Sequence, residues 1–548
     1  MHVLVAEMVG RALAELGATH SFGLVGSGNF AVTSSLVECG VEFIAARHEC
    51  GAVAMADGYA RCSGEVGVAT VHQGPGLTNA VTAVAEAAKA RTPLILVAAD
   101  TPAAAVHSNF RIDQRGLAAA VGAVPERINS PSSAAADVAR AWRTAAQERR
   151  TVVLNLPLDV QTMQWSGDFI APQPAPSPPG PSPAAVSALA DLIQGARRPV
   201  VIAGRGAVRS GARAGLERLA DQVGALLATS ANGNGLFAGN PWSLGISGGF
   251  ASPAAARLLE EADLVLSFGA SLNMWTTRHG SLIAAGTKVV QVDIDEEVIG
   301  AHVSIDAGMV SDAATAAEAL IEELRRRGFE GRGFRSDEMA AKVAGGRWKD
   351  EPFDDASSDD RVDPRALTTA LDDVLPHERI VAIDSGHFMG WPAMYLSVPD
   401  PAGFVFAQSF QSVGLGLATS IGAAVSRPDR VTVACLGDGG ALMAAGEFET
   451  VVRLGLPIVI VVYNDAAYGA EVHHFRPQGV ALQTVRFPDA DLAGLARGLG
   501  AEAHRVSSVE DLRALERWLL DPSAPLVLDA KVTPGVVAEW LEDAFRAH

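Results

Sequence analysis

VTVACLGDGGALMAAGEFETVVRLGLPIVIVVYNDAAYGAE, residues 431–471, is the stretch of sequence that predicts the fold. An apolar run at 431–436 leads into the turn GDGG, a helix-like segment follows, and a second apolar run at 457–463 ends on Asn464 and Asp465. This order predicts a strand, a glycine loop, a crossover helix and a second, parallel strand. We therefore expect the acidic ends of both strands at the same edge of one sheet.

The aspartates that end these two strands, Asp438 and Asp465, predict a metal and phosphate site. Glycines beside Asp438 let backbone amides approach an anion, and the helix start that follows them favours phosphate. Carboxylate oxygens are suitable ligands for a hard divalent cation. A single GDG alone would be only a tight turn after a strand. With the second strand and its Asn-Asp end in register, the sequence indicates a magnesium–diphosphate site.

Length and charge narrow the class of protein. A chain of 548 residues is too long for a single core and is expected to form about three domains. The formal net charge of −19 argues against a general nucleic-acid binder, and no apolar run is long enough to cross a bilayer. The four cysteines are scattered, and the start of the chain has no signal-peptide pattern. We therefore expect a cytoplasmic protein.

Three blocks of alternating apolar runs and helix-like segments predict an α/β fold with three domains, each a mostly parallel sheet flanked by helices. The first domain is expected at residues 1–165, the second at 184–328 and the third at 362–548. A proline-rich connector at 167–183 separates the first two blocks. A polar, charged passage at about 325–363 separates the second from the third.

The segment at 431–471 resembles the diphosphate-binding motif of thiamine diphosphate enzymes, which opens with GDG and closes on paired asparagines. The resemblance covers essentially the whole chain and points to the acetolactate synthase, pyruvate oxidase and benzoylformate decarboxylase group. It implies pyrimidine-binding, central Rossmann-like and diphosphate-binding domains, and Mg²⁺ held by Asp438, Asp465 and the backbone carbonyl of Ala467. Asp465 departs from the family pattern, because asparagine is usual there, and it adds negative charge near the diphosphate.

A second motif, Arg47-His48-Glu49, precedes a helix-like segment in the first block and resembles the RHE motif of the same family. The resemblance implies that Glu49 contacts the aminopyrimidine ring of thiamine and promotes its activation, which requires an acid at this position. Without the other motif, Glu49 would be a helix-start glutamate paired with a neighbouring arginine. Val413 aligns with the bulky residue that holds the cofactor in a bent shape, although valine is smaller than the usual residue.

The resemblance implies cofactor contacts from both ends of the chain, including the loop VHQGPGLTN at 71–79. The predicted cofactor-binding residues are Glu49, Gly76, Asn79, His387, Val413, Gly437, Asp438, Gly439, Gly440, Asp465, Tyr468 and Gly469.

Besides Glu49, three residues are candidates for catalysis. Ser27 and His72 fall where benzoylformate decarboxylase places a serine and a histidine, which would hold a carboxylate and shuttle a proton. Alternatively, Ser27 caps a helix and His72 is a loop residue satisfied by backbone. Glu471 falls where some relatives carry a catalytic glutamate and others an apolar residue. Four further residues would either reach the pocket or only cover it: His107, Asn109, His473 and His474.

The central block bears on whether the protein binds FAD. Acetolactate synthases carry the stretch GARFDDR there, whereas this chain reads GASLNMW at 269–275, without either arginine. Arg278 is nearby but out of register, and Gly204-Arg205-Gly206 is only weak evidence for a nucleotide loop. FAD is therefore possible but disfavoured.

The sequence thus predicts a thiamine diphosphate- and magnesium-dependent enzyme that acts on 2-oxo acids or aldehydes as a non-oxidative decarboxylase, a carboligase, or both. One alternative is an FAD-dependent oxidase of the pyruvate oxidase kind, and another is a homologue that binds the cofactor without turnover. The resemblance also implies a homodimer or homotetramer, with active sites at the subunit interface.

Overall fold

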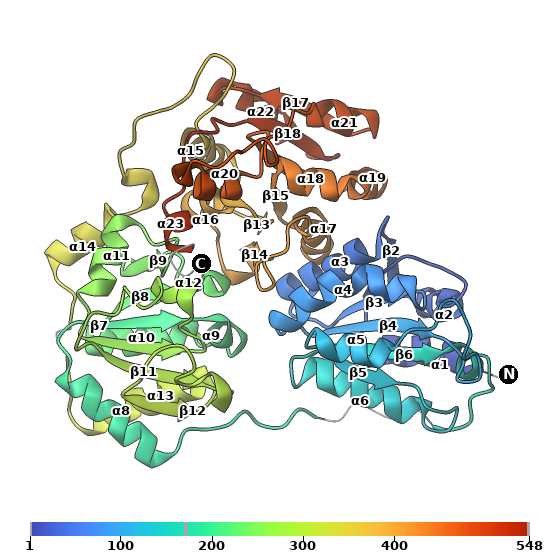
Figure 1. The fold of residues 1–548 in the computed structure, drawn as a ribbon. Coiled ribbons are helices and arrows are strands. Elements are labelled where there is room, and N and C mark those ends of the chain that lie inside the picture. The colour runs from blue at the N-terminus through green and yellow to red at the C-terminus, as the bar shows by residue number, and fades with distance from the viewer. Residues whose placement is uncertain (1–2, 169–173, 332, 545–548) are drawn as a thin grey trace.

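The computed structural model describes residues 3–168, 174–331 and 333–544, and it contains three six-stranded sheets flanked by helices (Figure 1). Every strand pair within these sheets is parallel. The predicted α/β fold with three parallel sheets is confirmed. In the described part of the chain, no helix is both long and apolar enough to span a membrane.

The first sheet has the strand order β2-β1-β3-β4-β6-β5. Its strands are β1 (His20–Gly23), β2 (Glu42–Ala45), β3 (Gly67–Val71), β4 (Leu94–Asp100), β5 (Val124–Arg127) and β6 (Thr151–Pro157). Its helices are α1 (Val5–Leu16), α2 (Phe30–Glu38), α3 (Glu49–Ser63), α4 (Pro75–Lys89), α5 (Gln114–Ala120), α6 (Ala134–Ala146) and α7 (Leu158–Gln161).

The central sheet has the order β12-β11-β10-β7-β8-β9, which is the classical doubly wound order of Rossmann folds. Its strands are β7 (Pro199–Ala203), β8 (Leu226–Thr229), β9 (Ser243–Ile246), β10 (Leu264–Phe268), β11 (Lys288–Asp293) and β12 (Ala307–Val310). Its helices are α8 (Pro183–Gly195), α9 (Arg205–Arg209), α10 (Arg213–Val223), α11 (Pro253–Glu260), α12 (Met274–Thr277), α13 (Ala313–Arg326) and α14 (Asp337–Ala344).

The third sheet has the order β14-β13-β15-β16-β18-β17, which repeats the order of the first sheet position by position. Its strands are β13 (Arg379–Ile383), β14 (Phe404–Phe406), β15 (Val431–Gly437), β16 (Ile458–Asn464), β17 (Glu502–Val506) and β18 (Leu526–Lys531). Its helices are α15 (Pro364–Val374), α16 (Gly390–Tyr395), α17 (Gly416–Ser426), α18 (Asp438–Met443), α19 (Ala445–Leu454), α20 (Gly469–Phe475), α21 (Leu492–Gly498), α22 (Arg513–Trp518) and α23 (Trp540–Ala544).

The two segments predicted to separate the blocks differ from each other in secondary structure. Within the proline-rich connector, residues 174–182 form no helix or strand, and residues 169–173 lie outside the described part. The polar passage at 325–363, in contrast, contains α14. Met339 and Val343 of this helix are buried in a core cluster of the central domain, so the passage is partly structured by apolar anchors.

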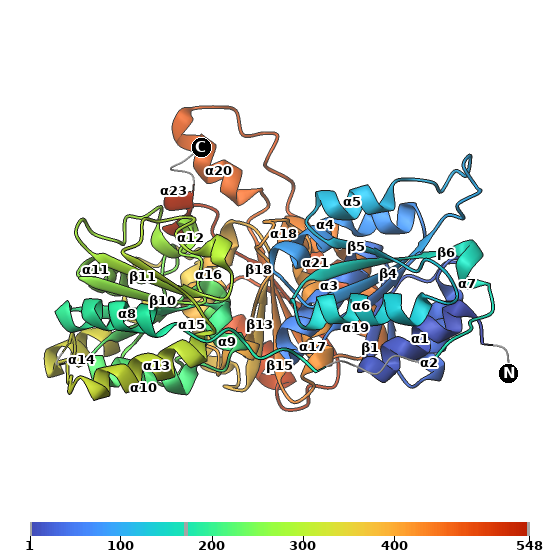
Figure 2. The same cartoon turned by 90° about the horizontal axis from the view of Figure 1, so that it is seen from below.

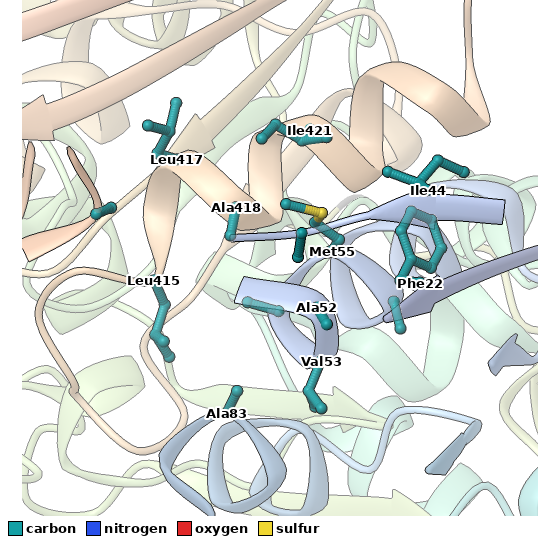
Figure 3. Packing of buried hydrophobic residues seen from close by; sticks show 14 of the residues in the cluster. Phe22, Ile44, Ala52, Val53, Met55, Ala83, Leu415, Leu417, Ala418 and Ile421 are labelled. Carbon is teal, nitrogen blue, oxygen red and sulfur yellow. The ribbon is translucent and has the colours of Figure 1, made fainter. Parts of the chain in front are cut away.

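The third sheet lies between the other two when the molecule is seen from below (Figure 2). It shares one core with the first domain, in which α3 packs against α17. Met55 of α3 lies beside Ala418 and Ile421 of α17 (Figure 3). A side chain at Gly58 or Gly422 would collide with the backbone of the opposite helix, so these glycines permit the close approach. The first and third domains are thereby held together within one chain.

Candidate active site

Strands β15 and β16 are neighbours in the third sheet and bring Asp438 and Asp465 to one edge of it. The strands pair in parallel up to Gly437 and Tyr463. Asp438 directly follows β15 and begins α18, and Asp465 directly follows β16. The strand, loop, crossover and strand predicted from residues 431–471 are therefore present, with two helices in the crossover.

A cavity of about 980 Å³ opens over this edge, and it is lined by the central and third domains. Among the described residues of the first domain, only Lys89 lines it. The cavity gathers most of the residues predicted for the diphosphate and metal: His387, Val413, Gly437, Asp438, Gly439, Gly440, Asp465, Ala467, Tyr468, Gly469 and also Glu471.

The glycines at this edge leave no room for side chains. A Cβ atom at Gly440 would collide with Oδ2 of Asp384, and one at Gly439 would lie 3.0 Å from a ring carbon of Tyr468. A Cβ atom at Gly469 would lie 2.6 Å from Oδ2 of Asp465. Packing therefore allows only glycine beside Asp438, so the backbone amides stay accessible, as a phosphate-binding loop requires.

Burial makes both strand-end aspartates resist ionisation. Burial, and then the charge of Asp465, raise the pKa of Asp438 to about 7. Burial raises the pKa of Asp465 to about 6. A divalent cation between the two carboxylates would favour their ionised forms and offset their repulsion. Two carboxylates with a nearby backbone carbonyl at Ala467 are oxygen donors of the kind that Mg²⁺ takes, so the donor set fits this ion.

The structure also limits what else could hold a metal. In the described ranges, no three His, Cys, Asp or Glu side chains gather closely enough to form a metal site by themselves. A cation at this edge would therefore depend on backbone or ligand oxygens besides Asp438 and Asp465. The N–H of Ala467 donates to Oδ1 of Asp465 over 3.2 Å, which ties the third predicted donor to the second.

Replacing Asp465 by asparagine is expected to preserve magnesium-dependent cofactor binding and to weaken its dependence on pH. The amide oxygen can still bind the cation, while loss of the second carboxylate lowers the pKa of Asp438. With that pKa at about 7, wild-type affinity is expected to rise about tenfold between pH 6 and pH 8, because protons compete with the metal. Calorimetric titration of thiamine diphosphate with Mg²⁺ at both pH values measures this ratio. If the affinity ratio between pH 8 and pH 6 were the same in the wild type and the variant, the proposed effect of Asp465 on the pKa of Asp438 would be contradicted.

A loop at residues 407–415, which we call the Val413 loop, ends beside the cavity edge. Asp384, which directly follows β13, is fully buried and accepts N–H bonds from Gly414 and Leu415 over 3.0–3.2 Å. Burial raises the pKa of Asp384 to about 6. A Cβ atom at Gly440 would lie 3.4 Å from Val413 Cγ1, so the predicted wedge residue stands next to the glycine turn.

Two histidines from different elements meet at the cavity wall. The rings of His387 and His473 lie 4.4 Å apart, and Nε2 of His387 accepts the N–H of Ala538 over 2.9 Å. Burial lowers the pKa of His387 to about 3, so this imidazole is neutral and carries its proton on Nδ1. His473 lines the cavity, whereas His474 is not among the residues that line it. His107 and Asn109 are exposed on the first domain and do not line it either.

The first domain forms a second cluster around Glu49. Glu49 begins α3 and is 8% exposed, and its Oε2 accepts an N–H bond from Asn79 over 3.0 Å. The neighbouring Arg47 pairs with Glu449 of the third domain, so the simple pairing of Glu49 with Arg47 is absent. One carboxyl oxygen of Glu49 is thus oriented by Asn79, and no hydrogen bond to the other is found in the described chain.

Ser27 and His72 lie in loops beside this cluster, and Gly76 lies in the first turn of α4. Nδ1 of His72 accepts the N–H of Gly28 over 3.0 Å, so the neutral ring carries its proton on Nε2. Burial lowers the pKa of His72, and the charge of Glu49 opposes that shift. Ser27 is exposed and does not cap α2, because Asn29 occupies the N-cap position. A Cβ atom at Gly76 would lie 3.2 Å from His72 Cβ.

One residue that sequence reasoning missed connects this cluster to the third domain. Glu447 of α19 is buried and accepts N–H bonds from Arg47 and His48 over 3.0 and 3.1 Å. A Cβ atom at Gly51 would collide with its carboxylate. Glu447 therefore holds the start of α3, and no sequence pattern links two segments 400 residues apart. Asp384 was also missed, although it follows the apolar strand β13 just as Asp438 follows β15.

The central domain gives Arg278 a structural role. Its guanidinium donates to the carbonyls of Gly248 and Ala251, both over 3.0 Å. Arg278 therefore braces a backbone turn. Arg205, which follows β7, lines the cavity.

Comparison with known proteins adds to this geometry. Residues 4–120 match the thiamine pyrophosphate enzyme N-terminal TPP binding domain, 186–320 match the central domain, and 384–530 match the C-terminal TPP binding domain. These three matches assign the chain to a class of enzymes that use thiamine diphosphate. The chain is a member of the thiamine pyrophosphate enzyme family, as its motifs predicted.

Three curated relatives show the range of activities within this family. A sulfoacetaldehyde acetyltransferase of Castellaniella defragrans is 31% identical over 90% of this chain and 87% of its own length. A probable acetolactate synthase large subunit of Methanococcus aeolicus is 26% identical over 92% and 89%. A probable 2-ketoarginine decarboxylase of Pseudomonas aeruginosa is 30% identical over 93% and 90%. The predicted enzyme class, a thiamine diphosphate-dependent decarboxylase or carboligase, is confirmed at this level.

Proposed function

We propose that this protein is a thiamine diphosphate- and magnesium-dependent enzyme that removes carbon dioxide from a 2-oxo acid and releases an aldehyde or transfers the remaining acyl unit to a second carbonyl. The observation that carries the proposal is the pair of aspartates at the strand ends that open into the large cavity, of which Asp438 is buried and Asp465 is half-buried. Without a cation, ionisation of both carboxyl groups is unfavourable. The pair also lies beside a glycine turn without side chains, which is suited to a diphosphate.

Each side chain has a role that follows from its surroundings. When bound, thiamine diphosphate supplies a nucleophilic carbon and a ring that stores the charge released by decarboxylation. Asp438, Asp465 and the carbonyl of Ala467 would hold the magnesium ion. Glu49, oriented by Asn79, would share a proton with the cofactor's pyrimidine.

Two further side chains would handle the substrate. His72 offers an Nε2–H donor, because its Nδ1 is already an acceptor, and Ser27 lies exposed in the neighbouring loop. Together they would bind the substrate carboxylate. Glu471 lines the cavity on α20, from which a carboxyl group could exchange a proton with the product.

A complete site would need two chains. In one chain, the Glu49 cluster does not line the cavity that holds Asp438 and Asp465. We therefore propose a homodimer, or a tetramer of two dimers, in which Glu49 of one chain faces the cavity of its partner. We further propose a cytoplasmic location, which the four unpaired cysteines support.

Carbon dioxide release from a panel of 2-oxo acids, with thiamine diphosphate and Mg²⁺, tests the proposed function. We expect turnover that depends on both additions and a colourless protein. A yellow protein that consumes oxygen would support a flavin-dependent oxidase instead. Tight cofactor binding without turnover of any acid or aldehyde would support a non-catalytic homologue.

A further inference from the structure

The Val413 loop is held on one side by a carboxylate from the first domain. Glu86 of α4 accepts the N–H of Ser409 over 3.0 Å and the N–H of Phe410 over 2.6 Å. Arg61 of α3 donates to the carbonyl of Phe406 over 2.9 Å. The backbone on both sides of Gln408 is therefore fixed from another domain.

This attachment is rigid because it is buried and ionic. The guanidinium of Arg61 pairs with Asp57 and with Glu86, each over 2.8 Å, and both carboxylates are at most 2% exposed. Thr92 adds a hydrogen bond to Asp57 over 2.6 Å. A backbone held this firmly gives a side chain on it a precise position.

Gln408 is the side chain so placed, and it lines the cavity. Both its amide nitrogen and its amide oxygen are buried, and neither has a hydrogen-bond partner in the described part of the chain. A buried carboxamide with both ends unpaired is unfavourable for the protein alone, whereas a ligand can satisfy it. The position thus has the properties of a ligand contact.

Two cations, Lys89 and Arg205, line the same cavity as Gln408. Lys89 lies one helical turn beyond Glu86, with its Nζ 5.7 Å from the ring centre of Phe410. Arg205 lies near enough to Arg61 and Glu86 for their charges to act on its pKa. Both line the cavity, and among the described residues neither makes an ion pair. Burial, then Arg61 and Arg91, lower the pKa of Arg205 to about 10, so it remains charged at neutral pH.

We propose that Gln408, Lys89 and Arg205 form a second recognition subsite, which binds an anionic group that the substrate carries in addition to its 2-oxo acid group. The amide N–H of Gln408 donates to this anion, and the two cations balance its charge. This inference rests on the proposed function, because it names the substrate class of the same cavity.

Matched pairs of 2-oxo acids test the subsite. 2-Oxoglutarate and 2-oxopentanoate differ by a carboxylate in place of a methyl group, and 3-sulfopyruvate and 2-oxobutyrate differ by a sulfonate in the same way. We expect kcat/KM for at least one acid-bearing member to exceed that of its methyl partner by about tenfold or more. Calorimetric binding of the same pairs to protein loaded with thiamine diphosphate and Mg²⁺ gives a readout that does not need turnover.

Variants then assign this preference to the subsite. Arg205→Gln and Gln408→Leu are each expected to bring the ratio of kcat/KM for the acid-bearing member to that for its methyl partner within about threefold of one. Arg513→Gln, a change at an exposed residue of α22, is expected to leave this ratio as in the wild type. Gln408→Leu should also leave the thermal midpoint of the ligand-free protein unchanged or raised, because it removes an unpaired buried amide. A purely structural role for Gln408 would lower that midpoint instead.

Three results would overturn the proposal. One is wild-type protein that favours the methyl-ended acids in both turnover and calorimetry. A second is a preference that neither variant alters. The third is Arg205-dependent binding of ADP or FAD, which would assign the cations to a nucleotide. Failure to release carbon dioxide from any acid would refute the proposed function. The ratio of calorimetric affinities for the matched acids would still test the subsite separately.

Discussion

Replacing Glu49 by glutamine is expected to leave cofactor affinity nearly unchanged and to lower kcat by roughly 10²–10⁴-fold. Glutamine keeps the shape of the side chain and an oxygen that accepts the N–H of Asn79, which now contacts Oε2 of Glu49. It cannot share an acidic proton with the cofactor's pyrimidine. The chemical step therefore loses its acid, while binding is largely preserved.

Carbon dioxide release and calorimetry on the same preparation separate these two effects. Glu42→Gln is a matched control, because Glu42 is an exposed glutamate at the start of β2 in the same domain. Near-normal turnover in Glu49→Gln would refute the assignment. A collapse of cofactor affinity with normal folding would instead give Glu49 a binding role.

Replacing Asp438 by alanine is expected to abolish the contribution of Mg²⁺ to cofactor binding. Loss of groups that only support a metal ligand costs 10–100-fold in affinity, so loss of the ligand itself should cost roughly 100-fold or more. Alanine also removes the carboxyl group whose pKa burial and Asp465 raise to about 7. The variant should therefore fold well and bind thiamine diphosphate weakly, whether or not Mg²⁺ is present.

The matched control is Asp429→Ala, an aspartate that precedes the same strand at its opposite end and pairs with Arg427. Calorimetric titration of thiamine diphosphate with Mg²⁺ and with EDTA compares the proteins. Unchanged affinity in Asp438→Ala would exclude Asp438 as a ligand of the metal.

The sequence was sufficient to predict the features that depend on local pattern. Strands β15 and β16 are long apolar runs with acidic ends, and a parallel crossover places such ends on one edge. The glycine turn and the RHE motif carried the family resemblance. Periodicity, turn chemistry and spacing predicted the fold class and a metal and phosphate site at the sheet edge, whereas the resemblance supplied the thiamine cofactor and the role of Glu49.

What the sequence did not reveal depends on contacts between distant segments. The first and third sheets have the same strand order, yet their sequences show no obvious repeat. Glu447 holds the start of α3 across two domains, and Glu86 holds the backbone around Gln408 in the same way. Such residues resemble ordinary helix-surface glutamates in the sequence, and only tertiary packing makes them buried acceptors.

The structure also changes the meaning of Asp465. The sequence presented it as a departure from an asparagine, whereas its burial beside Asp438 makes it half of a coupled acidic pair. A cation is the simplest means of stabilising that pair at neutral pH. Asp465 therefore supports the proposed magnesium site.

Complementation between two inactive variants tests most directly the central claim that Glu49 of one chain serves the Asp438 cavity of another. Chains carrying Glu49→Gln and chains carrying Asp438→Ala are unfolded and refolded together, or co-expressed with distinct tags, and carbon dioxide release is measured. Each mixed dimer would contain one intact site and one doubly altered site, so random pairing predicts about a quarter of wild-type activity. Activity that stays at the level of the separate variants, despite mixed dimers isolated through both tags, would contradict the shared site.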